Sequence, residues 1–172
     1  MYSIQQQNQN ISRDGLRLAS KSPCVNTALL SLPAPAKSAK AHWADPALAI
    51  FLAGYYDVAT LAAARELGAF FEAWVVHHLR VLAELLTPRG RLFYWRTIAG
   101  QEVDLVIEQG QHLLAIEMKW SKTVRFADAD GLRLFLQQHP QAVGGVLLYR
   151  GAEVRRLDER ILALPVGLML GV

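Results

Sequence analysis

Residues 102–120 read EVDLVIEQGQHLLAIEMKW, which is two strand-like runs on either side of a short polar turn. The second run is mostly apolar but contains Glu117 and Lys119, two residues apart. Because side chains alternate between the two faces of a strand, these two side chains are expected on one face. The stretch therefore predicts a hairpin that carries a carboxylate and an ammonium group side by side.

The expected register of this hairpin brings acidic residues of both runs together. A turn at 109–110 would pair Asp104 with Ala115 and Glu102 with Glu117. Asp104 would then lie diagonal to Glu117, with their Cβ atoms roughly 7 to 8 Å apart. Two carboxylates at that separation could share one metal ion.

The alternation also predicts which face each residue of the first run takes. Glu102 and Asp104 are expected on one face, and the apolar residues on the other: Val103, Leu105 and Ile107. Carboxylates crowded on an apolar hairpin repel one another, and burying each costs on the order of several kcal/mol. Lys119 would offset one charge, and Mg²⁺ or Mn²⁺ would offset more. The alternative is an amphipathic edge hairpin whose charged face is simply solvated.

The rest of the chain predicts an α/β domain. Strands at 91–97, 102–108 and 112–120 should form an antiparallel meander, and the expected helix before a strand at 142–149 would let that strand join in parallel. The other expected elements are a short helix starting at Asp45-Pro46, a helical region from about 58 to 86 with Gly68 as a candidate break, a helix capped by Asp128 or Asp130, a run at 153–157, and a short apolar helix or coil from Ile161. The expected fold is a mixed sheet flanked by helices.

Size and composition exclude several classes of protein. A chain of 172 residues with 52% hydrophobic content is long and apolar enough for one packed domain. Its net charge of +3 suits contact with phosphate without requiring it. Cys24 is the sole cysteine, which excludes an internal disulfide and favours a cytoplasmic setting. We find no secretory signal and no apolar run of membrane-spanning length, and no feature predicts an oligomeric state.

The first 40 residues differ from the rest. They are rich in Gln, Asn, Ser, Pro and Ala and show no sustained periodicity, so we expect a poorly structured arm or the remnant of an upstream domain. The alternative is a strand or helix docked on the main body. The main domain is expected to span 41–172.

Two sets of motifs resemble known families. Glu102-Val-Asp104, followed by Ile116-Glu117-Met118-Lys119, resembles the core signature of the PD-(D/E)XK nuclease superfamily, which implies a restriction-endonuclease-like fold. Over roughly 41–170 the chain also resembles the C-terminal domain of unknown function found in uncharacterised AAA-type ATPases. That second resemblance rests additionally on FEAWV (71–75), YWRT (94–97) and EMKWS (117–121).

The superfamily resemblance implies a role for each of four residues. Asp104 and Glu117 would be ligands of Mg²⁺ or Mn²⁺, Lys119 would position or activate the attacking water, and Glu72 would be an outer metal ligand. The implied activity is metal-dependent hydrolysis of phosphodiester bonds in DNA or RNA. Glu72 could instead be an ordinary helix glutamate at the edge of the core.

Several basic residues are candidates for contact with a nucleic-acid backbone, although they do not concentrate on any expected face. They are Arg96 beside Trp95, and Lys122 with Arg125.

The chain departs from the ATPase family in one respect. No segment matches Gly-x-x-x-x-Gly-Lys-Ser/Thr, so no ATP site of that type is expected, and residues 24–45 resemble a shortened linker. This suggests a fragment, a truncated gene or a stand-alone derivative. Two functions stay open: a metal-dependent nuclease, or an inactive nuclease-fold module that binds nucleic acid or a protein partner and was once attached to an ATPase.

Overall fold

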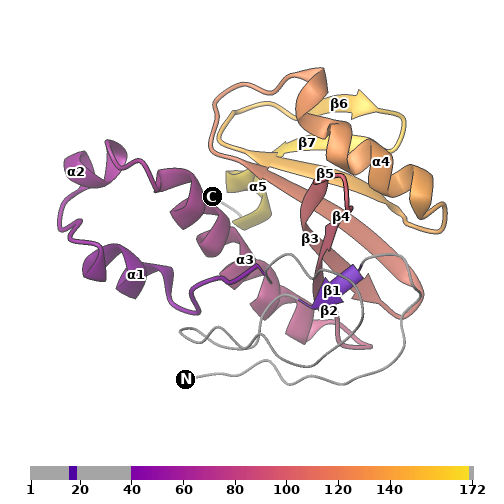
Figure 1. Cartoon of the computed structure of the whole chain (residues 1–172), viewed down its shortest axis with the longest axis horizontal. Coiled ribbons are helices and arrows are strands. Elements are labelled where there is room, and N and C mark those ends of the chain that lie inside the picture. The colour runs from indigo at the N-terminus through magenta and orange to yellow at the C-terminus, as the bar shows by residue number, and fades with distance from the viewer. Residues whose placement is uncertain (1–15, 19–39, 171–172) are drawn as a thin grey trace.

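The 102–120 hairpin lies in the middle of a mixed sheet (Figure 1). The computed structural model describes residues 16–18 and 40–170, and across them the sheet has seven strands in the order β1-β2-β3-β4-β5-β7-β6. The strands are β1 (Leu16–Leu18), β2 (Arg91–Arg96), β3 (Glu102–Gln109), β4 (His112–Lys119), β5 (Gly144–Tyr149), β6 (Arg155–Asp158) and β7 (Ile161–Pro165).

Helices connect and cover these strands. They are α1 (Pro46–Leu52), α2 (Val58–Ala62), α3 (Leu67–Leu85), the short 3₁₀ helix η1 (Phe126–Ala129), α4 (Asp130–Gln138) and α5 (Val166–Leu170). Strands β2, β3 and β4 are antiparallel neighbours, and β5 joins β4 in parallel after the crossover through α4. The expected meander and the expected parallel strand are both confirmed.

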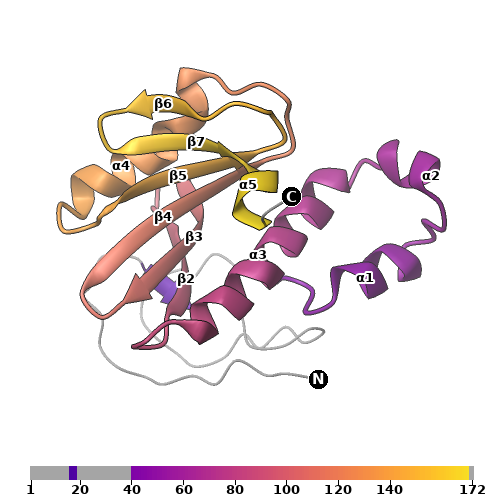
Figure 2. The same cartoon turned by 180° about the vertical axis from the view of Figure 1, so that it is seen from behind.

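The two faces of the sheet are covered by different helices. Helix α4 lies over one face, and α3 and α5 lie over the other (Figures 1 and 2). The core on the α4 side includes Trp95, Leu132 and Phe135, and the core on the α3 side includes Val75 and Leu105. The predicted α/β class, a mixed sheet flanked by helices, is confirmed.

The run from Ile161 forms a strand, so the expectation of a helix or coil there is wrong. Strand β7 pairs with β5 in parallel, and its Ile161 and Ala163 are buried whereas Leu162 between them is exposed. A short apolar run fits either element by sequence alone. Here the run is a strand because it forms backbone hydrogen bonds with the edge of β5. The helix α5 begins only after Pro165.

The helical elements begin and end slightly differently from the expectation. Asp45 caps α1 through its carboxylate, which accepts a hydrogen bond from the backbone N–H of Leu48, as expected. The long helical region breaks between α2 and α3, just before Gly68. Neither expected aspartate caps α4; instead, Asp128 accepts a hydrogen bond from the backbone N–H of Arg125 and closes the turn of η1.

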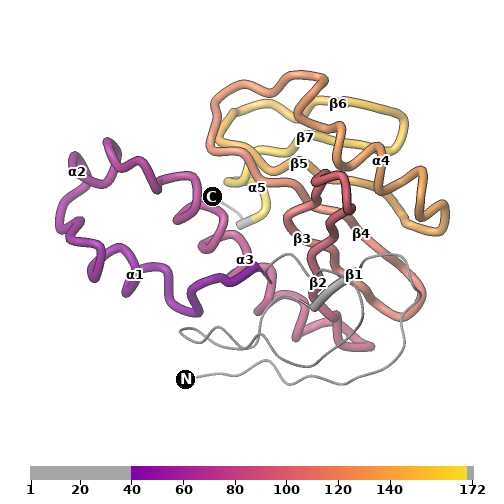
Figure 3. The backbone as a smooth tube through the Cα atoms, in the orientation of Figure 1, coloured from indigo at the N-terminus to yellow at the C-terminus, as the bar shows by residue number. Residues whose placement is uncertain are grey.

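Helices α1 and α2 extend away from the sheet and join the rest of the domain through α3 (Figure 3). Most of the expectation for residues 1–40 falls outside the described residues. Within it, the backbone of Leu16–Leu18 pairs with β2. The domain boundary at residue 41 stays a prediction.

Within residues 40–170, no helix has both the length and the apolar content needed to cross a bilayer. The cytoplasmic location stays a prediction.

Gly131 controls how closely α4 approaches β3. A Cβ atom there would lie 2.3 Å from the backbone oxygen of Glu102, so the backbone would have to move. We expect Gly131→Ala to lower the free energy of unfolding by about 1–3 kcal/mol, although alanine favours helix. In the control Gly68→Ala, where nothing lies within 4 Å, stability should rise by about 0.5–1 kcal/mol. Urea denaturation measures both, and equal effects of the two substitutions would contradict the close packing.

Candidate functional site

A β-bulge in β3 shapes the candidate site. Asp104 and Leu105 together lie opposite Tyr94 alone, so β3 carries one extra residue there. The bulge interrupts the alternation of faces: Val103 packs into the α4-side core, whereas Leu105 packs into the α3-side core. The prediction that Val103 shares a face with Leu105 and Ile107 is therefore wrong for Val103.

The register of the β3–β4 hairpin is two residues away from the predicted one. Gln109 pairs with His112, which leaves a two-residue turn containing Gly110 at a φ of 61°. The ladder continues as far as the pair Leu105 and Ile116. Extended by one step, it places Asp104 opposite Glu117 rather than diagonal to it. A shift of two residues keeps every β4 side chain on its predicted face.

The Asp104 carboxylate lies at the end of this ladder and is only 7% exposed. Its Oδ2 accepts a hydrogen bond of 2.9 Å from the backbone N–H of Met118, and its Oδ1 accepts one of 2.5 Å from the ammonium group of Lys40. Asp104 therefore links the end of β4 to the segment that leads into α1.

Glu117 and Lys119 form a contact pair, as the sequence predicts. The Lys119 Nζ lies 3.0 Å from Glu117 Oε1. Glu117 is 8% exposed, and its second oxygen, Oε2, is buried without a hydrogen-bond partner among residues 40–170. A buried carboxylate oxygen without a donor is costly, so this atom is a candidate for binding a cation.

Burial and the neighbouring charges change the pKa values of this pair. Burial, and then the Asp104 carboxylate, raise the pKa of Glu117 to about 7, against the opposing effect of Lys119. Burial acts to lower the pKa of Lys119, but the Glu117 and Asp104 carboxylates outweigh it and raise this pKa. Lys119 is therefore a protonated ammonium group at neutral pH.

Glu72 reaches the same site from α3. The Lys40 Nζ lies 2.6 Å from Glu72 Oε1, so this ammonium group sits between the carboxylates of Glu72 and Asp104. Burial, and then Asp104, raise the pKa of Glu72, and Lys40 opposes this effect. The order across the site is Glu72, Lys40, Asp104, Glu117 and Lys119.

Two residues of this site, Lys40 and His42, were not predicted. Lys40 lies in the segment expected to be a loose arm, and no local pattern connects it with Asp104, which is 64 residues away. His42 Nε2 lies 3.7 Å from Glu72 Oε1. Burial, and then Lys40, lower the pKa of His42 to about 4. His42 is therefore neutral at pH 7 and does not offset the carboxylates.

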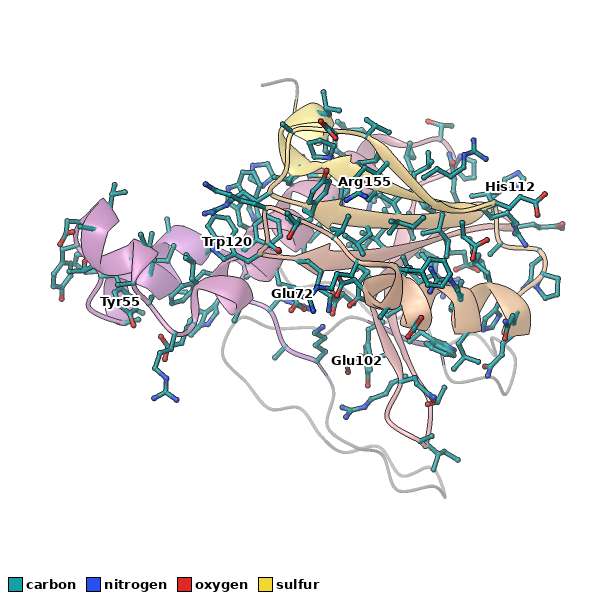
Figure 4. The ribbon with its side chains drawn as sticks, turned by 90° about the horizontal axis from the view of Figure 1, so that it is seen from above. Tyr55, Glu72, Glu102, His112, Trp120 and Arg155 are labelled. Atoms are coloured by element: carbon teal, nitrogen blue, oxygen red, sulfur yellow. The ribbon has the colours of Figure 1, made fainter. Side chains whose placement is uncertain are left out.

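Glu102 and Trp95 behave differently from the expectation. Glu102 is exposed and pairs with Arg96, whose Nε lies 3.8 Å from Glu102 Oε2. Trp95 is only 1% exposed and packs against Phe135, so it offers no surface for stacking beside Arg96. Figure 4 shows Glu102 and Glu72 on neighbouring parts of the molecule. Glu102 is near enough to Glu72 for its charge to act on that carboxylate, but because Glu102 is exposed, the acids enclosed at the site are Asp104, Glu117 and Glu72.

The donor set fits Mg²⁺ or Mn²⁺ in part. Mg²⁺ is commonly held by one or two carboxylates and several waters. Glu117 Oε2, which has no hydrogen-bond partner among residues 40–170, is open to such an ion, whereas the oxygens of Asp104 are already bonded to Lys40 and to the backbone N–H of Met118. Among residues 40–170, however, no three His, Cys, Asp or Glu side chains are arranged to hold a metal ion. The carboxylate of Glu72 already contacts Lys40, and its role as a metal ligand stays a prediction.

The fold and this cluster define a mixed α/β domain in which buried carboxylates contact two partly exposed lysines at the end of the central hairpin. Residues 67–169 match the family described as a domain of unknown function, DUF4143, and the chain belongs to that family. No curated protein and no solved structure matches the chain. The resemblance to a domain of unknown function is thus confirmed, and the nuclease activity stays a prediction.

The raised pKa of Glu117 predicts a pH dependence of stability. Between the ordinary value of 4.5 and about 7, the folded protein holds a proton that the unfolded chain has lost, so stability falls as the pH rises through this range. At about 1.4 kcal/mol per pKa unit, the loss across this range is about 3–4 kcal/mol. Glu117→Gln should remove this part of the pH dependence in urea denaturation with EDTA present. The exposed control Glu84→Gln should keep it, and identical curves for wild type and Glu117→Gln would contradict the prediction.

Proposed function

We propose that this domain hydrolyses phosphodiester bonds of DNA or RNA with Mg²⁺ or Mn²⁺, as a member of the PD-(D/E)XK nuclease superfamily. The observation that supports this most is the convergence of Asp104, Glu117 and Lys119 at one end of the β3–β4 hairpin, where Glu117 Oε2 has no hydrogen-bond partner in the part of the chain that the structure describes.

Asp104 and Glu117 would hold the metal. A divalent ion bound there would act as a Lewis acid that stabilises the charge developing on the phosphoryl oxygens. Hydrolysis forms a bond from a water oxygen to phosphorus and breaks the bond from phosphorus to the leaving sugar oxygen, which takes up a proton. The backbone N–H of Met118 orients the Asp104 carboxylate by holding its Oδ2.

Lys119 acts as a donor in this proposal. Because Glu117 and Asp104 raise its pKa, its side chain stays an ammonium group and cannot act as a general base at neutral pH. It can hold the attacking water by a hydrogen bond and stabilise negative charge on the phosphoryl group. Its contact with Glu117 Oε1 places that donor beside the proposed metal ligand.

Cleavage of single- and double-stranded DNA and RNA with Mn²⁺ or Mg²⁺ tests the proposal. Asp104→Ala and Lys119→Ala should each lower the cleavage rate by about 100-fold or more, because each removes a group that acts on the developing charge. The exposed controls Glu84→Ala and Arg89→Ala, which lie outside the site, should cleave like wild type. Metal-dependent activity that survives both site substitutions would exclude this site.

The second candidate is an inactive module that binds nucleic acid or a protein partner, formerly attached to an AAA-type ATPase. Lys40 favours it, because an internal ammonium group already neutralises Asp104 and Glu72 without a metal ion. In that case the charges of the site would only stabilise the fold and the segment before α1.

Calorimetry with Mn²⁺ separates the two candidates. In the nuclease proposal, wild type binds Mn²⁺ and Asp104→Ala does not. Lys40→Met should bind it about tenfold more tightly, because the ion no longer competes with an ammonium group. The remote control Arg89→Met should match wild type. An absence of Asp104-dependent binding in both wild type and Lys40→Met would support the inactive module instead.

A further inference from the structure

Trp120 is an exposed aromatic side chain directly beside the candidate site. It follows Lys119 at the end of β4 and is 39% exposed. Its ring packs against Phe71, with 5.2 Å between the ring centroids, and Phe71 precedes Glu72 on α3. Figure 4 shows Trp120 and Glu72 near each other, between Tyr55 at one end of the molecule and His112, the start of β4, toward the other. Trp120 thus adjoins the site along the chain, through Lys119, and in space, through its contact with Phe71.

Arg150 stacks on this ring. Its guanidinium carbon lies 4.4 Å from the centroid of the Trp120 ring, a cation–π contact. The backbone N–H of Arg150 donates a 2.9 Å hydrogen bond to the carbonyl oxygen of Ser121, so the chain segments after β4 and β5 are held together. The backbone therefore keeps Arg150 beside Trp120.

The charge of Arg150 is available to an external anion. Arg133 makes a similar contact with the Phe126 ring, at 3.3 Å, but its guanidinium also binds the carboxylates of Asp130 and Asp158. Arg150 is exposed, and within residues 40–170 it forms no ion pair with a carboxylate. An exposed guanidinium group that no carboxylate of the described residues neutralises suits a phosphate group.

The place of this pair in the sheet also suits ligand binding. Strands β4 and β5 are parallel, and Trp120 and Arg150 directly follow their carboxyl ends, where open α/β sheets commonly bind ligands. Lys122 and Arg125, in the connection after β4, are exposed as well. An anionic chain lying there would meet positive charge and an aromatic ring next to Lys119.

We propose that Trp120 and Arg150 form a stacking platform for an unpaired base of a single-stranded nucleic acid. In a duplex both faces of a base are covered by its neighbours, whereas an unpaired base can stack on the indole ring in place of the Arg150 guanidinium, which lies over that ring in this structure. Arg150 then contacts the adjacent phosphate, and the chain continues toward Lys119. This inference specifies the substrate form for the proposed function, and its binding step can be tested without cleavage.

Fluorescence anisotropy of the full chain in EDTA tests the platform, with labelled oligothymidine and a blunt duplex of the same length as probes. Trp120→Leu should weaken binding of the single strand by about tenfold, because one base loses its stacking partner, and change duplex binding by less than about twofold. Trp120→Phe should retain most of the single-strand affinity. The control Tyr56→Leu changes an aromatic side chain that is 74% exposed near α2, and it should match wild type.

Salt dependence tests Arg150 separately. If Arg150 contacts one phosphate, Arg150→Gln should reduce the slope of log affinity against log salt concentration by about 0.7 for the single strand. An unchanged slope would overturn the role of Arg150. Absence of single-strand binding by wild type, or equal losses on both probes with Trp120→Leu, would overturn the platform.

The outcomes separate this inference from the proposed nuclease activity. Binding of the single strand that depends on Trp120, together with no cleavage under any metal condition, supports the platform and contradicts the nuclease. Cleavage that depends on Asp104 but is equal for single and double strands, with no effect of Trp120→Leu on either, supports the nuclease and contradicts the platform.

Discussion

The structure depends on burying carboxylates of like charge at the point where β3 separates from β4. Asp104 and Glu117 are each less than a tenth exposed, and Glu72 approaches Asp104 from α3. Such a cluster is unfavourable unless positive charge lies nearby. Lys40 on one side and Lys119 on the other supply that charge, and the raised pKa of Glu117 shows that the compensation is incomplete.

The bulge at Asp104 makes this convergence possible. Glu117 and Lys119 lie on the α4 side of the sheet, whereas Glu72 comes from α3 on the other side. A regular strand would separate these groups by the thickness of the sheet. The regular pairing of β3 with β4 ends at Leu105, next to the bulge. The Asp104 carboxylate can therefore accept a hydrogen bond from the backbone of β4 and also contact the Lys40 ammonium group, which contacts Glu72. The site thus lies at an end of the sheet rather than on one face.

The same end of the sheet holds the exposed pair of Trp120 and Arg150. Both residues follow parallel strands, and the hydrogen bond between Arg150 and Ser121 keeps the two connections adjacent. The buried carboxylates with their lysine partners and an exposed aromatic and basic surface are therefore neighbours along the chain and in space. The proposed metal binding and the proposed nucleic-acid binding can be tested separately, because they are assigned to different side chains.

The sequence alone determined the α/β pattern, the antiparallel meander, the parallel strand after α4 and the shared face of Glu117 and Lys119. These features follow from periodicity and turn residues within short segments, which act locally. Only the tertiary structure decided the two-residue register shift, the bulge at Asp104, the strand from Ile161 and the place of Lys40 between Glu72 and Asp104. Each of these depends on which distant surfaces meet, and no pattern in neighbouring residues encodes a contact across 64 positions of the chain.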